Sequence, residues 1–319
     1  MAQASTSQTP PAPVPATAAP EMETIVTCTP TVVQTPLTVL VVGAGGNGAR
    51  IIPPLTQMLR RQDRLFIMDH DIVEDRNLVR QHFTERDIGQ PKALILAQRY
   101  RKRDLRPTAL VQRLTAENLG PTIQGLEWSH GPGHLVIVGC VDNNDARGII
   151  NRVITGPGIG SIQSTAYIDV GNERRGGQVL MSLKTWPMAV RVLGQDLTQS
   201  RYYSMSTLHD AMPQLCKPTP WNCDECAVSN APSATTCSKC GRAQGSCGNR
   251  LDLQTVMVNH MAAGMVLNCL SWLMLGIPFT SAGAFFSTLN TVQPIKIKSV
   301  NHSRYTLGVD TSFADGAIS

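Results

Sequence analysis

Several features that would identify a membrane or secreted protein are missing from this 319-residue sequence. No uninterrupted apolar run reaches the roughly 20 residues of a membrane-spanning helix. The strongest candidate, Val256–Leu275, is interrupted by four polar residues, among them Asn259 and His260. The N-terminus has no basic segment followed by an apolar core, which is the pattern of a secretory signal peptide. We therefore expect a cytoplasmic protein without membrane contact.

Charge is also scarce, since only 16% of the residues are charged whereas 42% are apolar. This balance supplies enough apolar residues for a sizeable core and excludes a disordered polyelectrolyte. The formal net charge of +5 is too mild to imply a nucleic-acid partner. The length fits one large domain or two small ones.

The first 36 residues contain no Lys or Arg but hold seven of the 21 prolines, together with many Ala and Thr. Such a composition cannot bury a core. We predict a disordered tail over residues 1–36, with order beginning as early as Thr24, and a folded domain over residues 37–319. That domain carries 28 basic and 21 acidic residues, a net charge of +7.

Strand-like and helix-like patterns alternate along the folded domain. Apolar runs rich in β-branched residues predict strands at 37–43, 64–69, 108–113, 134–142, 166–170 and 178–183, and helical patterns occupy 47–61, 91–102 and about 145–154. This order predicts an α/β fold with a Rossmann-like, mostly parallel sheet flanked by helices. Pro53 and Pro54 would strain the first helix unless they lie in its first turn. The later segment 253–275 is apolar on all sides and predicts a buried helix, and residues 284–299 predict one or two final strands.

A glycine-rich turn follows the first predicted strand. The segment VVGAGGNGAR places Gly43, Gly45, Gly46 and Gly48 between that strand and the next helix. Glycines in this position let the backbone approach a phosphate, and the helix N-terminus attracts the anion. Asp69, 21 residues beyond Gly48, ends the next strand, where a carboxylate can accept hydrogen bonds from ribose hydroxyls. The pattern indicates a nucleotide site but does not separate a dehydrogenase from an ATP-using enzyme.

The residues around and after Asp69 carry a more specific pattern. They read MDHDIVEDRNLVRQHF, then DIGQPKA, and later VGCVDNNDAR. With the glycine loop, these ordered motifs resemble the ThiF/MoeB/HesA superfamily, which includes the ubiquitin-activating enzymes. The resemblance covers about residues 37–183 and, more loosely, 247–299. It implies an adenylation domain that uses Mg-ATP to adenylate the C-terminal carboxylate of a ubiquitin-like protein.

The resemblance also implies a role for each residue that matches a motif. The four glycines would form the nucleotide loop, and Asp69 matches the acid on the ATP ribose. Lys92 matches the lysine that contacts phosphate, and Asp142 matches the acid associated with magnesium and catalysis. The segment that approaches the triphosphate is matched by Asn77, Arg80 and Gln81.

The residue chemistry points the same way. A carboxylate that attacks the α-phosphate must overcome the repulsion between two anions, which Arg80 and Lys92 can offset. Asp142 is a hard oxygen ligand at the carboxyl end of a parallel strand, where it can hold Mg²⁺. Structural roles remain open: Arg80 and Lys92 could be solvated surface charges, and Asp142 could cap the next helix. Asp71 and Glu74 could serve only to order their loop.

One part of the family pattern is absent. Many members supply an N-terminal arginine to the ATP phosphates, often from a partner subunit, whereas the first basic residue here is Arg50. Either Arg50 takes this role or the activity is altered, and a homodimer of the usual geometry remains open. Half of the basic residues, 14 of 28, lie between Arg50 and Arg113, from which we predict a positive field around the triphosphate. Within that stretch, the run Arg99–Arg106 is typical of a solvated helix end, although an acidic partner or nucleic acid could also bind it.

Two C-x-x-C pairs occur in a segment rich in glycine, proline and polar residues. The cysteines, separated by ten residues between the pairs, are Cys223, Cys226, Cys237 and Cys240. Two such pairs converge on tetrahedral zinc, and four thiolates leave no position for a water ligand. We therefore predict a structural zinc knuckle within an insertion at residues 216–250.

The spacing of this knuckle, with Trp221 and Asn230, resembles the zinc finger of the Ran-binding-protein type. Members of that finger family bind ubiquitin or single-stranded RNA. Ala227 and Val228 replace the Thr-Phe pair of the ubiquitin-binding members, and the knuckle offers few basic and aromatic residues for RNA. We favour a structural or protein-docking role.

Two further cysteines are candidates for covalent chemistry. Cys247 lies just before the long apolar helix, where ThiF-like proteins place a sulfur-transfer or thioester cysteine. Cys216 lies in the loop where activating enzymes place theirs, and Lys217 beside it would lower its pKa. Both could instead be packed or loop residues. Cys140 and Cys269 lie in apolar segments, where we expect them in the core.

Together these features predict ATP-dependent adenylation of the C-terminal glycine of a ubiquitin-like or sulfur-carrier protein, with release of pyrophosphate. A thioester step and a partner similar to a ubiquitin-conjugating enzyme could follow. The knuckle and the tail also resemble the ThiF-family component of the bacterial PRTRC gene system. The alternatives are a non-catalytic zinc scaffold with the same fold, or an NAD-dependent oxidoreductase, which would leave Lys92 and Asp142 unexplained.

Overall fold

The structure is a computed structural model. It describes residues 25–32, 34–79, 81–126, 133–157, 162–172, 176–192, 195–217, 220–223, 226–231, 234, 236–241, 256–287, 291–301 and 303–310. Two candidate residues, Arg80 and Cys247, lie outside these ranges, as do residues 1–24 of the predicted tail.

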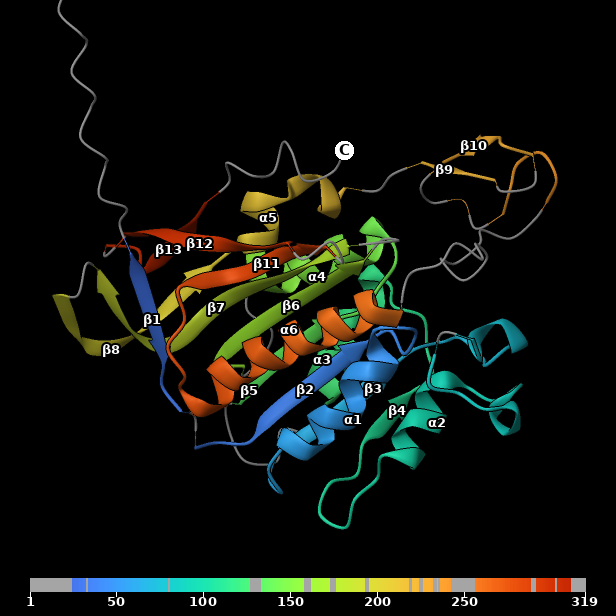
Figure 1. Cartoon of the computed structure of the whole chain (residues 1–319), viewed down its shortest axis with the longest axis horizontal. Coiled ribbons are helices and arrows are strands. Elements are labelled where there is room, and N and C mark those ends of the chain that lie inside the picture. Colours follow the sequence, from blue (N-terminus) through green and yellow to red (C-terminus); the bar gives the residue numbers. More distant parts are fainter. Residues whose placement is uncertain are drawn as a thin grey trace, which may run out of the picture.

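Parallel strands form the half of the sheet that carries the nucleotide motifs (Figure 1). Their order is β4 (Thr108–Leu110), β3 (Arg64–Met68), β2 (Leu37–Val42), β5 (His134–Gly139) and β6 (Ser164–Asn172). Strands β2 and β5 are buried along their whole length, as their apolar sequences predict for strands covered by helices on both faces. The predicted α/β fold with a parallel sheet is confirmed.

The helices of this half are α1 (Gly48–Met58), α2 (Lys92–Arg99), α3 (Ala116–Gly125) and α4 (Asn144–Thr155). Shorter helical segments are η1 (Asp75–Asn77), η2 (Glu85–Asp87), α5 (Thr207–Ala211) and η3 (Pro213–Cys216). The sequence did not predict α3. Its start is fixed by a capping box, in which Thr115 and Asn118 each accept a hydrogen bond from the other's backbone N–H.

Pro53 and Pro54 lie in the interior of α1 rather than in its first turn. Because proline has no N–H, Pro53 cannot donate to the carbonyl of Ala49 one turn earlier. The side chain of His82 donates to that carbonyl instead. The helix therefore continues through both prolines while the loop that follows η1 supplies a missing donor.

Beyond β6 the sheet continues mainly through antiparallel pairs. These strands are β7 (Gly176–Val192), β8 (Gln195–Met205), β11 (Ser281–Ser287), β12 (Thr291–Asn301) and β13 (Thr306–Val309), with β13 pairing in parallel to β8. The one or two strands predicted over residues 284–299 are observed as β11 and β12, and β13 follows them. The length of β7 and the presence of β8 were not predicted.

Strand β1 (Val26–Pro30) lies in the part of the predicted tail where order was expected from Thr24 onward. It lies within residues 1–36 and pairs antiparallel with β7. Its burial alternates along the chain, and Cys28 is fully buried. The average composition of the segment concealed this short run of alternating residues, which presents one apolar face to the core.

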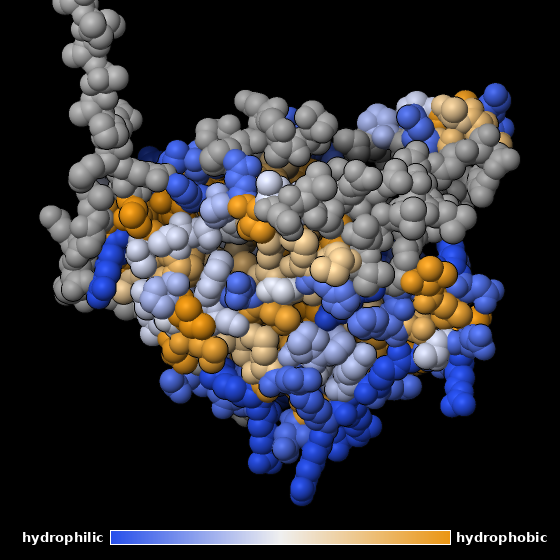
Figure 2. Space-filling view, in the orientation of Figure 1, coloured by the Kyte–Doolittle hydropathy of each residue, from blue (hydrophilic) through white to orange (hydrophobic). Residues whose placement is uncertain are grey.

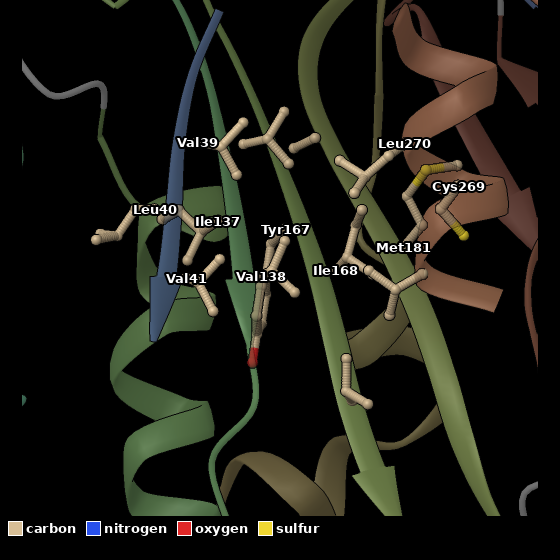
Figure 3. Packing of buried hydrophobic residues seen from close by; sticks show 14 of the residues in the cluster. Val39, Leu40, Val41, Ile137, Val138, Tyr167, Ile168, Met181, Cys269 and Leu270 are labelled. Carbon is tan, nitrogen blue, oxygen red and sulfur yellow. The ribbon is translucent and has the colours of Figure 1, made fainter. Parts of the chain in front are cut away.

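The long helix α6 (Val256–Leu275) lies across the sheet beside α1 (Figure 1). By length and composition alone it could span a membrane, but here it packs on β6 and β7. Figure 3 shows Cys269 and Leu270 directed toward Ile168 and Met181 of the sheet. The prediction of a buried helix is confirmed for the faces that pack on the sheet and on α1, but it is wrong for the remaining face, where residues such as Met257 and Leu275 are exposed.

Candidate functional site

A cleft of about 980 Å³ lies at the carboxyl ends of β2, β3 and β5. In a parallel sheet this edge is where ligands bind. The predicted residues that line it are Gly43, Gly45, Gly46, Asp69, Asn77, Gln81, Lys92 and Asp142. Motifs that are far apart in the sequence therefore share one cavity of the size expected for a small-molecule site.

The glycine loop is built by close backbone contacts. Gly43 has a φ of +97°, and a β-carbon there would lie 2.4 Å from the carbonyl oxygen of Cys140. A β-carbon on Gly48 would lie 2.0 Å from the carbonyl oxygen of Gly43. Arg50 is buried, and its Nη1 donates to the carbonyl of Gly46 at 2.9 Å. Arg50 therefore stabilises the glycine loop through this hydrogen bond. It is not among the residues that line the cleft.

Replacing Gly48 by alanine is expected to destabilise the domain by about 3 kcal/mol or more, because the added methyl group meets backbone that cannot rotate away. Gly120 in α3 is the matched control, since a β-carbon there has no atom within 4 Å. Gly120→Ala should be neutral or stabilise by about 0.5–1 kcal/mol. Chemical denaturation of both variants measures the difference, and equal stabilities would contradict the loop geometry.

Asp69 holds the glycine loop against the end of β3. Its Oδ2 accepts from the N–H of Ala44 at 2.5 Å, and its Oδ1 accepts from the N–H of Asp71 at 2.8 Å. Burial and the nearby Asp71 carboxylate raise the pKa of Asp69. Asp69 thus lies on the cleft wall, where the resemblance places the ribose acid, and it also fixes the loop conformation.

Lys92 is a buried cation in the wall of the cleft. Its side chain is 7% exposed, and Nζ lies 2.9 Å from Oδ2 of Asp71. The alternative of a solvated surface lysine is therefore excluded. Asp71 holds the ammonium group of Lys92 at the cleft. Asp71 therefore does more than order its own loop. Glu74 and Asn77 form a capping box at η1, in which Oδ1 of Asn77 accepts from the N–H of Glu74.

Asp142 follows β5 and is exposed on the cleft wall. The helix cap that the sequence left open for it is made by Asn143, whose Oδ1 accepts from the N–H of Ala146 at 2.8 Å. Asp142 can thus offer its carboxylate to a hard cation such as Mg²⁺. A second group of side chains that could hold a metal comprises Asp69, His70 and Asp71, whose ligand atoms lie within 4.8 Å of one another.

A buried ion pair that the sequence did not predict supports this edge of the cleft. Nε of Arg147 lies 3.2 Å from Oδ1 of Asp169, which also accepts from the hydroxyl of Tyr167 at 2.8 Å. Nη2 of Arg147 donates to the carbonyl of Val141 at 3.1 Å. Burial raises the pKa of Asp169, although Arg147 opposes this shift. The pair fixes the turn that carries Asp142. The one sign of this ion pair in the sequence was an aspartate, Asp169, within an apolar strand.

The basic run at the end of α2 does not reach the cleft. It precedes β4 and so lies at the amino end of the parallel strands, where Arg103 and Arg106 line a separate cavity of about 630 Å³. Figure 2 shows hydrophilic residues gathered over this end of the molecule. Among the described residues, the basic ones that line the cleft are Lys92, Arg113 and Arg147. Within the described part of the chain, fewer basic residues therefore face the cleft than the sequence count suggested.

The four cysteines of the two C-x-x-C pairs come together. They lie in the segment that contains the hairpin of β9 (Trp221–Asn222) and β10 (Ser229–Asn230), which is labelled in Figure 1. Their Sγ atoms are 3.6 Å apart between Cys223 and Cys240, 3.5 Å between Cys226 and Cys237, and 3.8 Å between Cys226 and Cys240. Tetrahedral zinc with Zn–S bonds of about 2.3 Å requires sulfur atoms about 3.8 Å apart. The cluster fits a zinc ion. Asn230 braces it, since its Oδ1 accepts from the N–H of Ser238 at 2.8 Å.

The other described cysteines are not activated. Cys216 is half-buried, and burial, with Asp169 nearby, raises its pKa to about 11. From the sequence, Lys217 was expected to lower the pKa of Cys216, and that expectation is wrong. The carbonyl of Cys216 packs against Gly148, where a β-carbon would approach to 2.6 Å. Burial raises the pKa of Cys269 to about 12, and Cys140 packs against the core as predicted.

Two kinds of relative resemble this chain. The NEDD8-activating enzyme E1 catalytic subunit of Saccharomyces cerevisiae is 45% identical over 80 residues, which cover 24% of this chain and 26% of that protein. Among solved structures, PaaA has a TM-score of 0.49 at 13% identity and covers 84% of this chain and 65% of its own. E. coli MccB has a TM-score of 0.47 at 13% identity and covers 81% of this chain and 63% of its own. The chain spans about a quarter of the yeast protein and under two thirds of both solved chains.

The family comparison covers most of the chain. The ThiF family matches residues 35–304, a stretch that contains the glycine loop, the cleft residues after β3 and β5, and the cysteine cluster. This match agrees with the motifs found in the sequence and with the cleft that gathers them. The chain belongs to the ThiF family.

Proposed function

We propose that this protein uses Mg-ATP to adenylate the C-terminal glycine carboxylate of a ubiquitin-like or sulfur-carrier protein, with release of pyrophosphate. Members of the ThiF family are adenylyltransferases or related enzymes. The observation that carries the proposal is the shared cleft, in which a phosphate-type glycine loop, a buried lysine and an exposed aspartate face one cavity. An oxidoreductase would have no use for the last two groups.

Each group has a defined task in this reaction. The substrate carboxylate attacks the α-phosphate, a P–O bond forms, and the bond to the leaving pyrophosphate breaks. Lys92, held at the cleft by Asp71, offsets the negative charge that develops on the phosphates. Asp142 would hold Mg²⁺, which when bound screens the pyrophosphate. The turn fixed by Arg147 keeps that carboxylate in place. The substrate supplies the nucleophile, so this step needs no activated side chain.

The knuckle is proposed to bind structural zinc and to serve as a rigid docking element. The carrier protein is the partner that this function requires. We propose a cytoplasmic location for this protein and for its carrier. A later thioester or persulfide step would fall to Cys247, because Cys216 has a raised pKa and packs against α4. The PRTRC-type system remains the proposed setting, with a protein similar to a ubiquitin-conjugating enzyme as a further partner.

The proposal is tested by exchange of labelled pyrophosphate into ATP. We expect exchange that depends on both Mg²⁺ and a small protein ending in Gly-Gly, with the genes beside this one as the first source of candidates. Truncating the last glycine of that protein should abolish the exchange. If the chain binds ATP but no neighbouring protein of this type supports exchange, the proposal fails.

A further inference from the structure

Three asparagine side chains from distant parts of the chain meet beside the glycine loop. Asn47 precedes α1, Asn172 ends β6, and Asn259 lies near the start of α6. Nδ2 of Asn172 donates to Oδ1 of Asn47 at 3.0 Å and also to Oδ1 of Asn259. All three line the nucleotide cleft, although Asn259 is only 1% exposed. The sequence predicted no role for any of them.

The donor group of Asn259 faces the glycine loop. Its Oδ1 is engaged by Asn172, which leaves the Nδ2 group to point elsewhere. This Nδ2 lies 3.3 Å from where a β-carbon of Gly46 would be. Among the described residues no hydrogen bond from this Nδ2 to an acceptor is found, and the atom is not among those that are fully buried without a partner. Asn259 is nearly buried but lines the cleft. An amide donor in such a place costs free energy unless an acceptor reaches it, and an apolar residue would suit the rest of this helix face better.

We infer that Asn259 donates a hydrogen bond to a phosphate oxygen of the bound nucleoside triphosphate, and that Asn172 positions it for this contact. The inference rests on the proposed nucleotide function and adds to it a ligand-binding residue from the C-terminal helix. A hydrogen bond to an anionic oxygen is stronger than one between neutral groups. The glycine at position 46 leaves the space that the amide and the phosphate share.

The substitution Asn259→Asp tests this contact most directly. The new carboxylate keeps the acceptor for Asn172 but replaces the donor with a negative charge facing the phosphates. We expect the affinity for Mg-ATP, measured by calorimetry, to fall at least about ten-fold. Relative to the unmodified protein at the same pH, the loss should shrink as the pH is lowered from about 8 to about 5.5. Burial and the neighbouring phosphates would raise the pKa of the new carboxyl group, so that protonation removes its charge. A purely structural defect would not recover in this way.

Asn268→Asp is the matched control, since Asn268 is exposed on the same helix. Its ATP affinity should stay within about two-fold of the unmodified protein. If Asn259→Asp does not fold, Asn259→Leu removes the donor with a side chain of similar size. We expect it to retain the melting temperature and to weaken ATP binding several-fold.

The outcomes separate this inference from the function on which it rests. An unmodified protein that does not bind ATP overturns both. An unmodified protein that binds ATP, together with folded Asn259 variants of equal affinity, overturns only the role of Asn259. Equal losses in Asn259→Asp and Asn268→Asp would also overturn it, because the effect would then be one of helix charge.

Discussion

The Lys92→Ala variant is expected to lose ATP–pyrophosphate exchange by about 100-fold or more. Nζ of Lys92 is buried in the cleft, 2.9 Å from Oδ2 of Asp71. Alanine removes the cation that would offset charge on the phosphates, and it leaves the Asp71 carboxylate without that cation. Both changes make the cleft more negative and repel a triphosphate. Exchange assays at saturating carrier protein measure the effect, and a melting curve checks that the variant is folded.

Arg106→Ala is the control for this experiment. Arg106 is exposed and lines the cavity at the opposite edge of the sheet, so exchange should be unchanged. Lys92→Arg keeps the charge but alters its geometry, and an intermediate loss is expected. If Lys92→Ala and Asp142→Ala both leave the biological activity intact, the protein is a non-catalytic scaffold and the proposed reaction is wrong.

Cys223→Ser is expected to abolish stoichiometric zinc binding. The four Sγ atoms already lie at separations that suit one tetrahedral ion, and each contributes a thiolate that serine cannot replace at neutral pH. Metal analysis of the purified protein should give about one zinc per chain before the change and almost none after it. Because structural zinc supplies folding free energy, protease sensitivity should rise between β9 and α6. The parallel sheet should keep its stability.

Cys216→Ser is the matched control, since Cys216 is half-buried and outside the cluster. It should retain the full zinc content. A purified chain without zinc, or a Cys223→Ser variant with normal zinc, would rule out the predicted metal site. Loss of ATP exchange in Cys223→Ser, with the sheet intact, would indicate that the knuckle takes part in substrate docking.

Local patterns predicted the parts of the site that depend on neighbours in the chain. The alternation of apolar strands and helices placed Gly43, Asp69 and Asp142 at strand ends, and parallel strands bring such ends to one edge. The C-x-x-C spacing likewise predicted, without any tertiary information, that the four cysteines cluster. Order from Thr24 onward was predicted, but strand β1 itself was not, because its five residues were averaged into a proline-rich segment.

Contacts between distant segments could not be predicted in this way. Nothing near Asp169 in the sequence indicates that Arg147 will pair with it, and nothing near Asn259 indicates the glycine loop. The pKa of Cys216 likewise depends on a distant contact, because the residue is buried against α4. This burial raises the pKa, whereas the sequence led us to expect that it would be lowered.

The sequence by itself determined the fold class, the glycine-rich loop, the family resemblance and the four-cysteine cluster, because each is encoded by short-range spacing. The tertiary structure alone decided which charges face the cleft. Among the basic residues counted between Arg50 and Arg113, Lys92 and Arg113 line the nucleotide cavity, while Arg103 and Arg106 lie at the other edge of the sheet. The physical reason is that a strand carries its two ends to opposite edges, so residues close in sequence can act on different surfaces.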